Sequence, residues 1–198
     1  LADAAYHDRM SEQLRMYTRA VYGFDHVARL AGAGDWDRPA PCQGWTARHV
    51  VGHVVAVHRF IHSRLVGVEP TLDPFGATDA HAGPDPYATW SALRDDVLEA
   101  LDQPGVLQRV VQSFNGDRVV NDLVGFNVID TTVHSWDLAR ALGVDDRLDP
   151  AQVAWSLALV EPVAPRLRAG GMFGPQVEIG ADADPQLRLL AITGREPR

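Results

Sequence analysis

The chain contains no lysine and has very little cysteine. All 18 basic residues are arginine, against 26 acidic residues, so the formal net charge is −8. An acidic surface argues against non-specific nucleic-acid binding and against docking on anionic lipid. The single cysteine, Cys42, excludes an internal disulfide and a zinc site built from cysteines.

Long hydrophobic runs are also missing. The run from Val50 to Val57 is interrupted by Gly52 and His53 and falls far short of the roughly 20 apolar residues that span a bilayer. No signal-peptide pattern opens the chain, so we expect a cytoplasmic protein with no membrane partner. With 198 residues, 46% of them hydrophobic, we expect a single globular domain over residues 1–198.

Apolar periodicity and Pro/Gly punctuation predict helices near 10–31, 45–66, 86–101, 121–142, 149–168 and 185–192. Thr46 is the expected N-cap of the second helix. Pro162 and Pro165 are expected to distort the fifth helix. We expect loops over 69–86 and 170–184. An Asn-Gly pair at Asn115 favours a short hairpin within 106–120. These elements predict an all-α bundle.

The second predicted helix carries four histidines, at positions 49, 53, 58 and 62. Spacings of four place His49 beside His53, and His58 beside His62, on adjoining turns. A helical histidine usually faces solvent or satisfies a buried polar group. Because apolar residues surround this helix on most sides, periodicity does not select a functional histidine among them.

The fourth predicted helix is more informative. One stripe at helical spacing contains Leu123, Phe126, Asp130, Val133, His134, Asp137 and Ala141. Isolated buried carboxylates are costly and usually become paired, protonated or metal-bound. An inward Asp-x-x-x-His pair is therefore typical of half a metal site. Two alternatives stay open: a buried Asp–His hydrogen bond without metal, and a face exposed to solvent.

Three segments together resemble a known family. Residues 41–53 are similar to the "C-x-G-W-[ST]-x-x-[DH]-[LV]-[VL]-x-H" entry to the second helix of DinB-like proteins. Residues 130–138 resemble the "[ED]-x-x-x-H-x-x-D-L" segment of the mycothiol-dependent maleylpyruvate isomerase metal-binding domain family. Residues 188–197 resemble the closing "R-L-L-x-x-x-G-R-x-P" of uncharacterised actinobacterial members. The resemblance follows the whole chain in order.

The resemblance implies a DinB-like four-helix bundle with an up-down-down-up layout and an added C-terminal helical segment. It also implies a divalent metal held by His53, Asp130 and His134. The family's isomerase has glutamate where this chain has Asp130, so the shorter side chain could lengthen the ligation, add a bridging water or shift the helix. Two imidazoles and one carboxylate suit Zn²⁺ with an open fourth position, and Ni, Mn, Fe or Co are alternatives.

The resemblance further implies that the open metal position takes a thiolate or water. Mycothiol would bind as thiolate and attack a small electrophilic substrate, giving conjugation or isomerisation. The arginine-only composition is typical of GC-rich genomes such as those of actinobacteria, some of which make mycothiol. The resulting hypothesis is a metal- and mycothiol-dependent transferase or isomerase. The alternatives are a non-catalytic metal-binding or sensing bundle, and a structural bundle with a decayed site.

Five further residues each have a functional and a structural interpretation. Asp137 is a candidate for orienting His134 or a metal-bound water, with pairing to an arginine as an equal alternative. Arg195 is a candidate clamp for a substrate or thiol carboxylate, against solvation as its default. For Cys42 and Trp45, as for Trp136, burial for packing is favoured over a role in catalysis or in the pocket wall. A homodimer is left open.

Overall fold

The structure is a computed structural model that describes residues 2–69, 78–113 and 116–196. Over these residues the chain is mainly helical and carries one short antiparallel hairpin. Its elements in order are α1 (Ala2–Ala28), α2 (Ala47–Val66), α3 (Thr78–His81), α4 (Pro86–Leu101), η1 (Val106–Gln108), β1 (Val110–Ser113), β2 (Gly116–Val119), α5 (Val120–Leu142), α6 (Pro150–Val160), α7 (Ala164–Ala169) and α8 (Pro185–Ile192).

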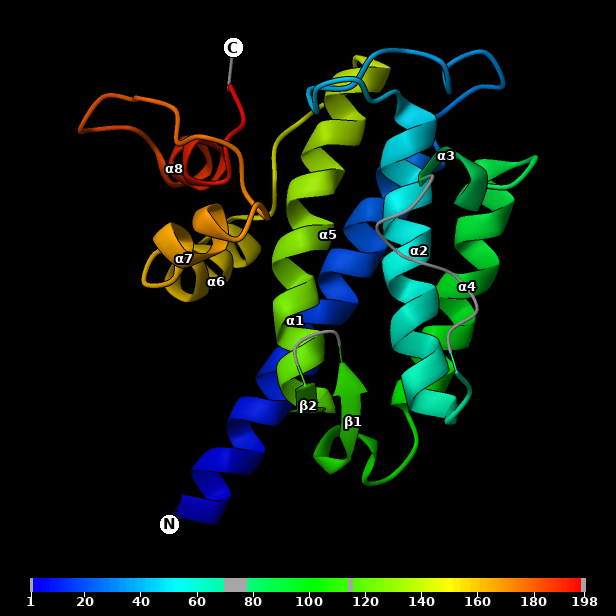
Figure 1. The fold of residues 1–198 in the computed structure, drawn as a ribbon, viewed down its shortest axis with the longest axis vertical. Helices are drawn as coiled ribbons and strands as arrows, with labels where there is room; N and C mark the ends of the chain where they lie inside the picture. The colour runs from blue at the N-terminus through cyan, green and yellow to red at the C-terminus, as the bar shows by residue number, and fades with distance from the viewer. Residues whose placement is uncertain (1, 70–77, 114–115, 197–198) are drawn as a thin grey trace.

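Four long helices, α1, α2, α4 and α5, form the bundle (Figure 1). Helix α1 rises, α2 and α4 descend, and α5 rises again, which confirms the DinB-like up-down-down-up layout. The contacts α1–α5, α2–α4 and α2–α5 close the bundle. Because α2 and α5 run in opposite directions side by side, the first turns of α2 face the later turns of α5.

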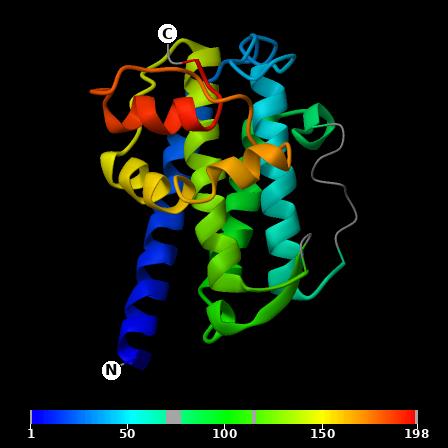
Figure 2. The ribbon, with the colours of Figure 1, turned by 60° about the vertical axis from the view of Figure 1, so that its left-hand side comes forward.

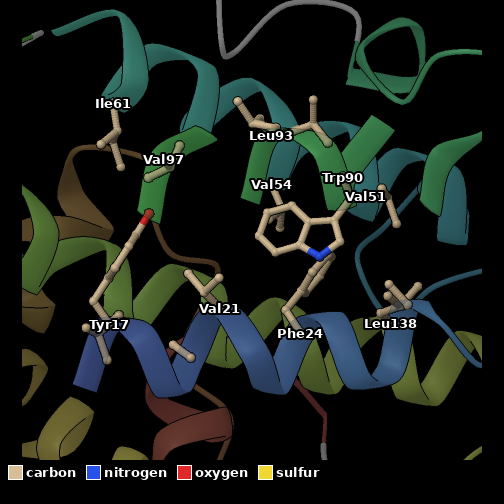
Figure 3. Packing of buried hydrophobic residues seen from close by; sticks show 14 of the residues in the cluster. Tyr17, Val21, Phe24, Val51, Val54, Ile61, Trp90, Leu93, Val97 and Leu138 are labelled. Atoms are coloured by element: carbon tan, nitrogen blue, oxygen red, sulfur yellow. The ribbon is translucent and has the colours of Figure 1, made fainter. Parts of the chain in front are cut away.

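The core of the bundle is apolar and tightly interlocked (Figure 3). Phe24 of α1 meets Trp90 of α4 edge to face, with ring centroids 4.9 Å apart. Valines of α2, including Val51 and Val54, lie completely buried between these helices. Apolar residues on most sides of α2 account for this burial, because a helix that is hydrophobic all round is buried.

A C-terminal segment packs beside the bundle (Figure 2). Helices α6, α7 and α8 cover one side of α5, where Ile129 and Val133 join a second apolar cluster with Leu157, Leu167 and Leu189. The chain then returns over the bundle end toward the loop that precedes α2 (Figure 1). This return brings the last described residues close to the later turns of α5.

Most helix boundaries agree with the local signals in the sequence. Helices α4 and α8 have the predicted bounds, Thr46 is the N-cap of α2, and Gly143 ends α5 with a φ of 71°. The hairpin also forms, as β1 and β2. Asn115, which predicted it, lies outside the described residues.

Four expectations need correction. The predicted helix over 149–168 is two helices, because α6 ends at Val160 and turns separate it from α7. The expected loop over 69–86 contains α3, although its residues 70–77 lie outside the described residues. Helix α1 extends from residue 2 to 28 rather than 10 to 31. Phe126 is 43% exposed, so the inward stripe of α5 is interrupted there.

Candidate metal centre

The predicted ligands come from two facing helices. His53 lies in the second turn of α2, whereas Asp130 and His134 lie one turn apart on α5. Since the two helices are antiparallel neighbours, these turns meet across their interface. The four-residue spacing on α5 then presents a carboxylate and an imidazole together to the histidine of α2.

The structure brings the donor atoms of these three side chains together. Asp130 Oδ1 lies 3.2 Å from His53 Nε2 and 3.6 Å from His134 Nε2. One donor atom from each residue lies within 4.8 Å of the others. Bonds of about 2.1 Å at tetrahedral angles separate neighbouring ligand atoms by about 3.4 Å. The three side chains therefore fit a divalent ion, and Asp130 reaches both imidazoles despite being one methylene shorter than glutamate.

The second carboxylate oxygen supports this fit. Asp130 Oδ2 is buried and has no hydrogen-bond partner among the residues that the structure describes. Leaving a buried carboxylate oxygen unpaired costs free energy, and an ion beside it removes that cost. The Asp130 side chain as a whole is 30% exposed, so the donor set is reachable from solvent.

Electrostatics at the set are dominated by Asp130. Burial opposes ionisation of Asp130, but the two histidine rings outweigh it and lower its pKa well below the usual range. Burial alone would lower the pKa of His53, yet Asp130 raises it above the ordinary value. The pKa of His134 is lowered, chiefly by burial. Metal ligation requires an ionised carboxylate and neutral imidazoles, so the lowered pKa values of Asp130 and His134 favour it, whereas an ion would have to displace the proton that the raised pKa of His53 favours.

Trp45 walls the donor set. Its ring stacks on His134, with centroids 5.8 Å apart and planes 15° apart, and lies 5.4 Å from the ring of His53. Its position directly before the N-cap of α2 places it there. Trp136, in contrast, is buried beneath Arg140, whose guanidinium lies 5.6 Å from the ring centre. Trp136 therefore has a packing role, as expected, whereas Trp45 also borders the donor set.

Behind His134 lies a buried group of charged side chains. Asp137 is completely buried, and its Oδ2 lies 2.8 Å from His134 Nδ1 and 2.9 Å from Arg195 Nη2. Burial opposes ionisation of Asp137, but Arg195 and His134 outweigh it and lower its pKa to about 2. The two alternatives weighed for Asp137, orienting His134 and pairing with an arginine, therefore occur together.

Cys42 completes this group and behaves as a thiol. It donates to Asp137 Oδ2 at 3.3 Å. Burial, with help from Asp137, raises the pKa of Cys42 to about 12, which disfavours a nucleophilic thiolate. Cys42, His134 and Asp137 form a second group of side chains whose ligand atoms lie close enough to hold a metal ion. The Arg195 guanidinium, 3.6 Å from Cys42 Sγ, supplies the positive charge there and disfavours a second cation.

The other histidines of α2 are engaged elsewhere. His49 Nδ1 accepts from the backbone N–H of Thr46 at the start of the helix. His58 is completely buried and pairs with Val54 O through Nδ1 at 2.8 Å. His62 is half-buried near the far end of α2. Sequence spacing alone did not distinguish His53 from these three, nor did it indicate that Arg195 meets Asp137.

Comparison with known proteins agrees with the family resemblance of the three sequence segments. The sequence model of the mycothiol maleylpyruvate isomerase N-terminal domain matches residues 19–139. Two uncharacterised proteins of Mycobacterium tuberculosis, one from strain CDC 1551 and one from strain H37Rv, are each 26% identical over 190 residues. The match covers 94% of this chain and 100% of each relative. No solved structure matches the chain significantly.

Proposed function

We propose, since the chain belongs to the mycothiol maleylpyruvate isomerase N-terminal domain family, that it is a divalent-metal-dependent thiol transferase or isomerase. Its thiol partner would be mycothiol, and its substrate a small electrophile. The donor set of His53, Asp130 and His134 is the observation that carries this proposal.

Three protein ligands suit a reactive centre better than a structural one. Structural zinc sites are closed by four protein ligands, whereas catalytic sites keep a position open. A divalent ion at this set would lower the pKa of a coordinated thiol and so supply a thiolate near neutral pH. Zinc is the favoured ion for two imidazoles and one carboxylate, with Ni, Mn, Fe and Co as alternatives.

The surrounding side chains keep the set ordered and partly dry. Trp45 stacks on the face of His134 and lies tilted against the ring of His53, a position that would limit the access of water to both rings. Asp137 faces His134 Nδ1 and favours the tautomer in which Nε2 is free to ligate. Asp130 would offset one of the two positive charges of a divalent ion. The exposed side of Asp130 is where a thiol and an electrophile would approach.

Metal analysis of the purified protein is the first test. We expect about one divalent ion per chain, and its loss in Asp130→Ala. Asp122→Ala, which removes an exposed carboxylate of the same helix, is the matched control and should retain the ion. Equal metal content in both variants would contradict the assigned ligand set.

The reaction itself is tested by adding mycothiol and a panel of activated alkenes and maleylpyruvate-like acids to the metal-loaded protein. Thiol binding and conversion should both need the metal and should both be lost in Asp130→Ala. Asp137→Asn, once saturated with the ion, should convert more slowly. Metal binding with neither thiol binding nor conversion would favour the non-catalytic alternative, a metal-binding or sensing bundle.

A further inference from the structure

The metal centre receives a residue from the far end of the chain. Arg195 follows α8 and lies beyond residues 19–139, which match the family model. Its side chain is only 15% exposed and reaches the bundle at Asp137. A C-terminal arginine thus contacts a carboxylate that itself faces a predicted ligand, His134.

The backbone around Arg195 is held in one conformation. Gly194 has a φ of +83°, and a Cβ there would lie 2.8 Å from Gly174 Cα. Glycine is therefore needed at 194 both for the backbone angle and for the close approach. The N–H of Arg195 donates to Leu190 O at 2.8 Å, and Nη1 donates to Thr193 O at 3.0 Å. These contacts fix the direction in which the guanidinium projects.

The guanidinium meets Asp137 with two of its nitrogens. Nη2 lies 2.9 Å from Oδ2 and Nε lies 3.4 Å from Oδ1. Such two-pronged pairing fixes the plane of a carboxylate as well as its charge. With Nη1 on Thr193, every nitrogen of the guanidinium has a partner. A substrate carboxylate would have to displace Asp137, so the pairing disfavours Arg195 as an anion clamp.

The carboxylate that Arg195 holds in place faces the back of a ligand ring. Asp137 Oδ2 lies 2.8 Å from His134 Nδ1, an ion-pair contact outside regular hydrogen-bond geometry, while His134 Nε2 lies 3.6 Å from Asp130 Oδ1. A neutral imidazole carries one proton, and an anionic neighbour favours that proton on the nearer nitrogen. The lone pair is then on Nε2, directed into the donor set.

We propose that Arg195 is a positioning residue of the metal centre, which acts through Asp137 to fix the tautomer and orientation of His134. Docking of the C-terminal segment thereby controls how tightly the donor set binds a divalent ion. The inference rests on the proposed function only in taking His53, Asp130 and His134 as ligands. The contacts from Arg195 to Asp137 and from Asp137 to His134 do not themselves involve a metal ion.

The affinity arm measures zinc binding by competition with a chelating dye. Arg195→Gln should weaken zinc binding roughly 10–100-fold, as removal of outer partners of ligating histidines does. Arg188→Gln, which removes an exposed ion pair of α8 with Glu161, is the matched control and should bind as the wild type does. In an Asp137→Asn background, Arg195→Gln should add no further loss. Unchanged zinc affinity in Arg195→Gln would overturn the proposal.

The second arm needs no metal. Nitrogen-15 NMR of the histidine rings should show His134 protonated at Nδ1 in the metal-free wild type and in Arg188→Gln. In Arg195→Gln both tautomers should appear. Should Arg195→Gln fail to fold, Arg195→Lys keeps the buried charge but loses the two-pronged contact, and it should shift affinity and tautomer in the same direction by less.

The two arms separate the two possible failures. A wild type that binds neither zinc nor Ni, Mn, Fe or Co but shows the ordered His134 tautomer, lost in Arg195→Gln, would overturn the proposed function and support the positioning role. If the wild type binds zinc but Arg195→Gln changes neither the His134 tautomer nor the zinc affinity, the positioning role is overturned and the proposed function stays intact.

Discussion

Two histidines on one helix, His53 and His58, occupy opposite environments. His53 faces Asp130 across the interface with α5, and this carboxylate raises its pKa despite burial. His58 lies deeper along α2, between the rings of Tyr17 and Trp90, and burial lowers its pKa to about 4. Five residues along α2 thus separate a histidine in a charged site, His53, from a histidine in the apolar core, His58.

The partners of each ring explain this difference. At His53, a carboxylate and a second imidazole replace water as neighbours. At His58, the only hydrogen bond described is to Val54 O, which requires a proton on Nδ1, and burial lowers the pKa so that the ring stays neutral near neutral pH. His58 therefore serves as a buried aromatic ring of the core, while His53 is placed to ligate. The predictions below test this contrast.

Exchanging each histidine should give the largest contrast. His53→Ala should abolish retention of a divalent ion, because it removes one of three ligands. His58→Phe keeps an aromatic ring between Tyr17 and Trp90 and should leave metal content unchanged. Elemental analysis of both purified variants measures this. Loss of the ion in His58→Phe with a native circular dichroism spectrum would undo the division between site and core.

Metal removal should reveal how the site joins two helices. An ion present at about 1,000 times its dissociation constant stabilises the folded state by about 4 kcal/mol. For a chain of this size, that corresponds to a rise in melting temperature of roughly 8–16 °C. Chelation should remove this rise in the wild type and have no effect on His53→Ala. Equal melting of the loaded and chelated wild type would rule out an ion that bridges α2 and α5.

Acidification of the metal-free protein should lower its folding stability through His58. Its pKa is about 4 in the folded state and 6.5 as the ordinary value, so the unfolded chain takes up the proton first. Folding stability should therefore fall by about 3 kcal/mol as the pH drops from about 6.5 to 4. His58→Phe should lack this fall. Denaturant titrations at several pH values measure it, and equal slopes in both proteins would contradict a neutral buried His58.

The buried carboxylate Asp137 should affect folding stability at lower pH than His58 does. The pKa of Asp137 is lowered to about 2, so its contribution is present above pH 4 and is lost as the pH falls toward 2. His53, whose pKa is raised, contributes stability at low pH that is lost as the pH rises above its folded value. His53 and His58 thus change the folding stability in opposite directions as the pH falls.

A smaller effect is expected at the glycine beside His53. A Cβ on Gly52 would lie 1.7 Å from Thr78 O of α3, so Gly52→Ala should displace α3 and cost about 1–3 kcal/mol. Gly23 of α1 is the control, since its nearest neighbour would be 3.9 Å away. Gly23→Ala should stabilise the helix by up to about 1 kcal/mol. Denaturant midpoints compare the two, and equal tolerance would mean that α3 packs less closely on α2.

Much of the fold follows from local sequence signals. Helices α4, α6 and α8 begin where an Asp-Pro pair supplies a cap and a first helical residue, and α5 ends at Gly143. Such signals act within a turn or two, so they are readable without the rest of the chain. The Asp130–His134 pair belongs here too, because helical spacing alone places both on adjoining turns.

The site needed the tertiary structure, because its members come from separate segments. Four histidines on α2 have similar sequence surroundings, and only packing against α5 places His53, rather than His58, opposite Asp130. Arg195 and Cys42 are 153 residues apart, yet both contact Asp137 once the C-terminal segment docks. The exposure of Phe126 is likewise decided by packing rather than by periodicity. Helix formation depends on neighbours in sequence, whereas the charge around each buried group depends on which distant helix lies against it.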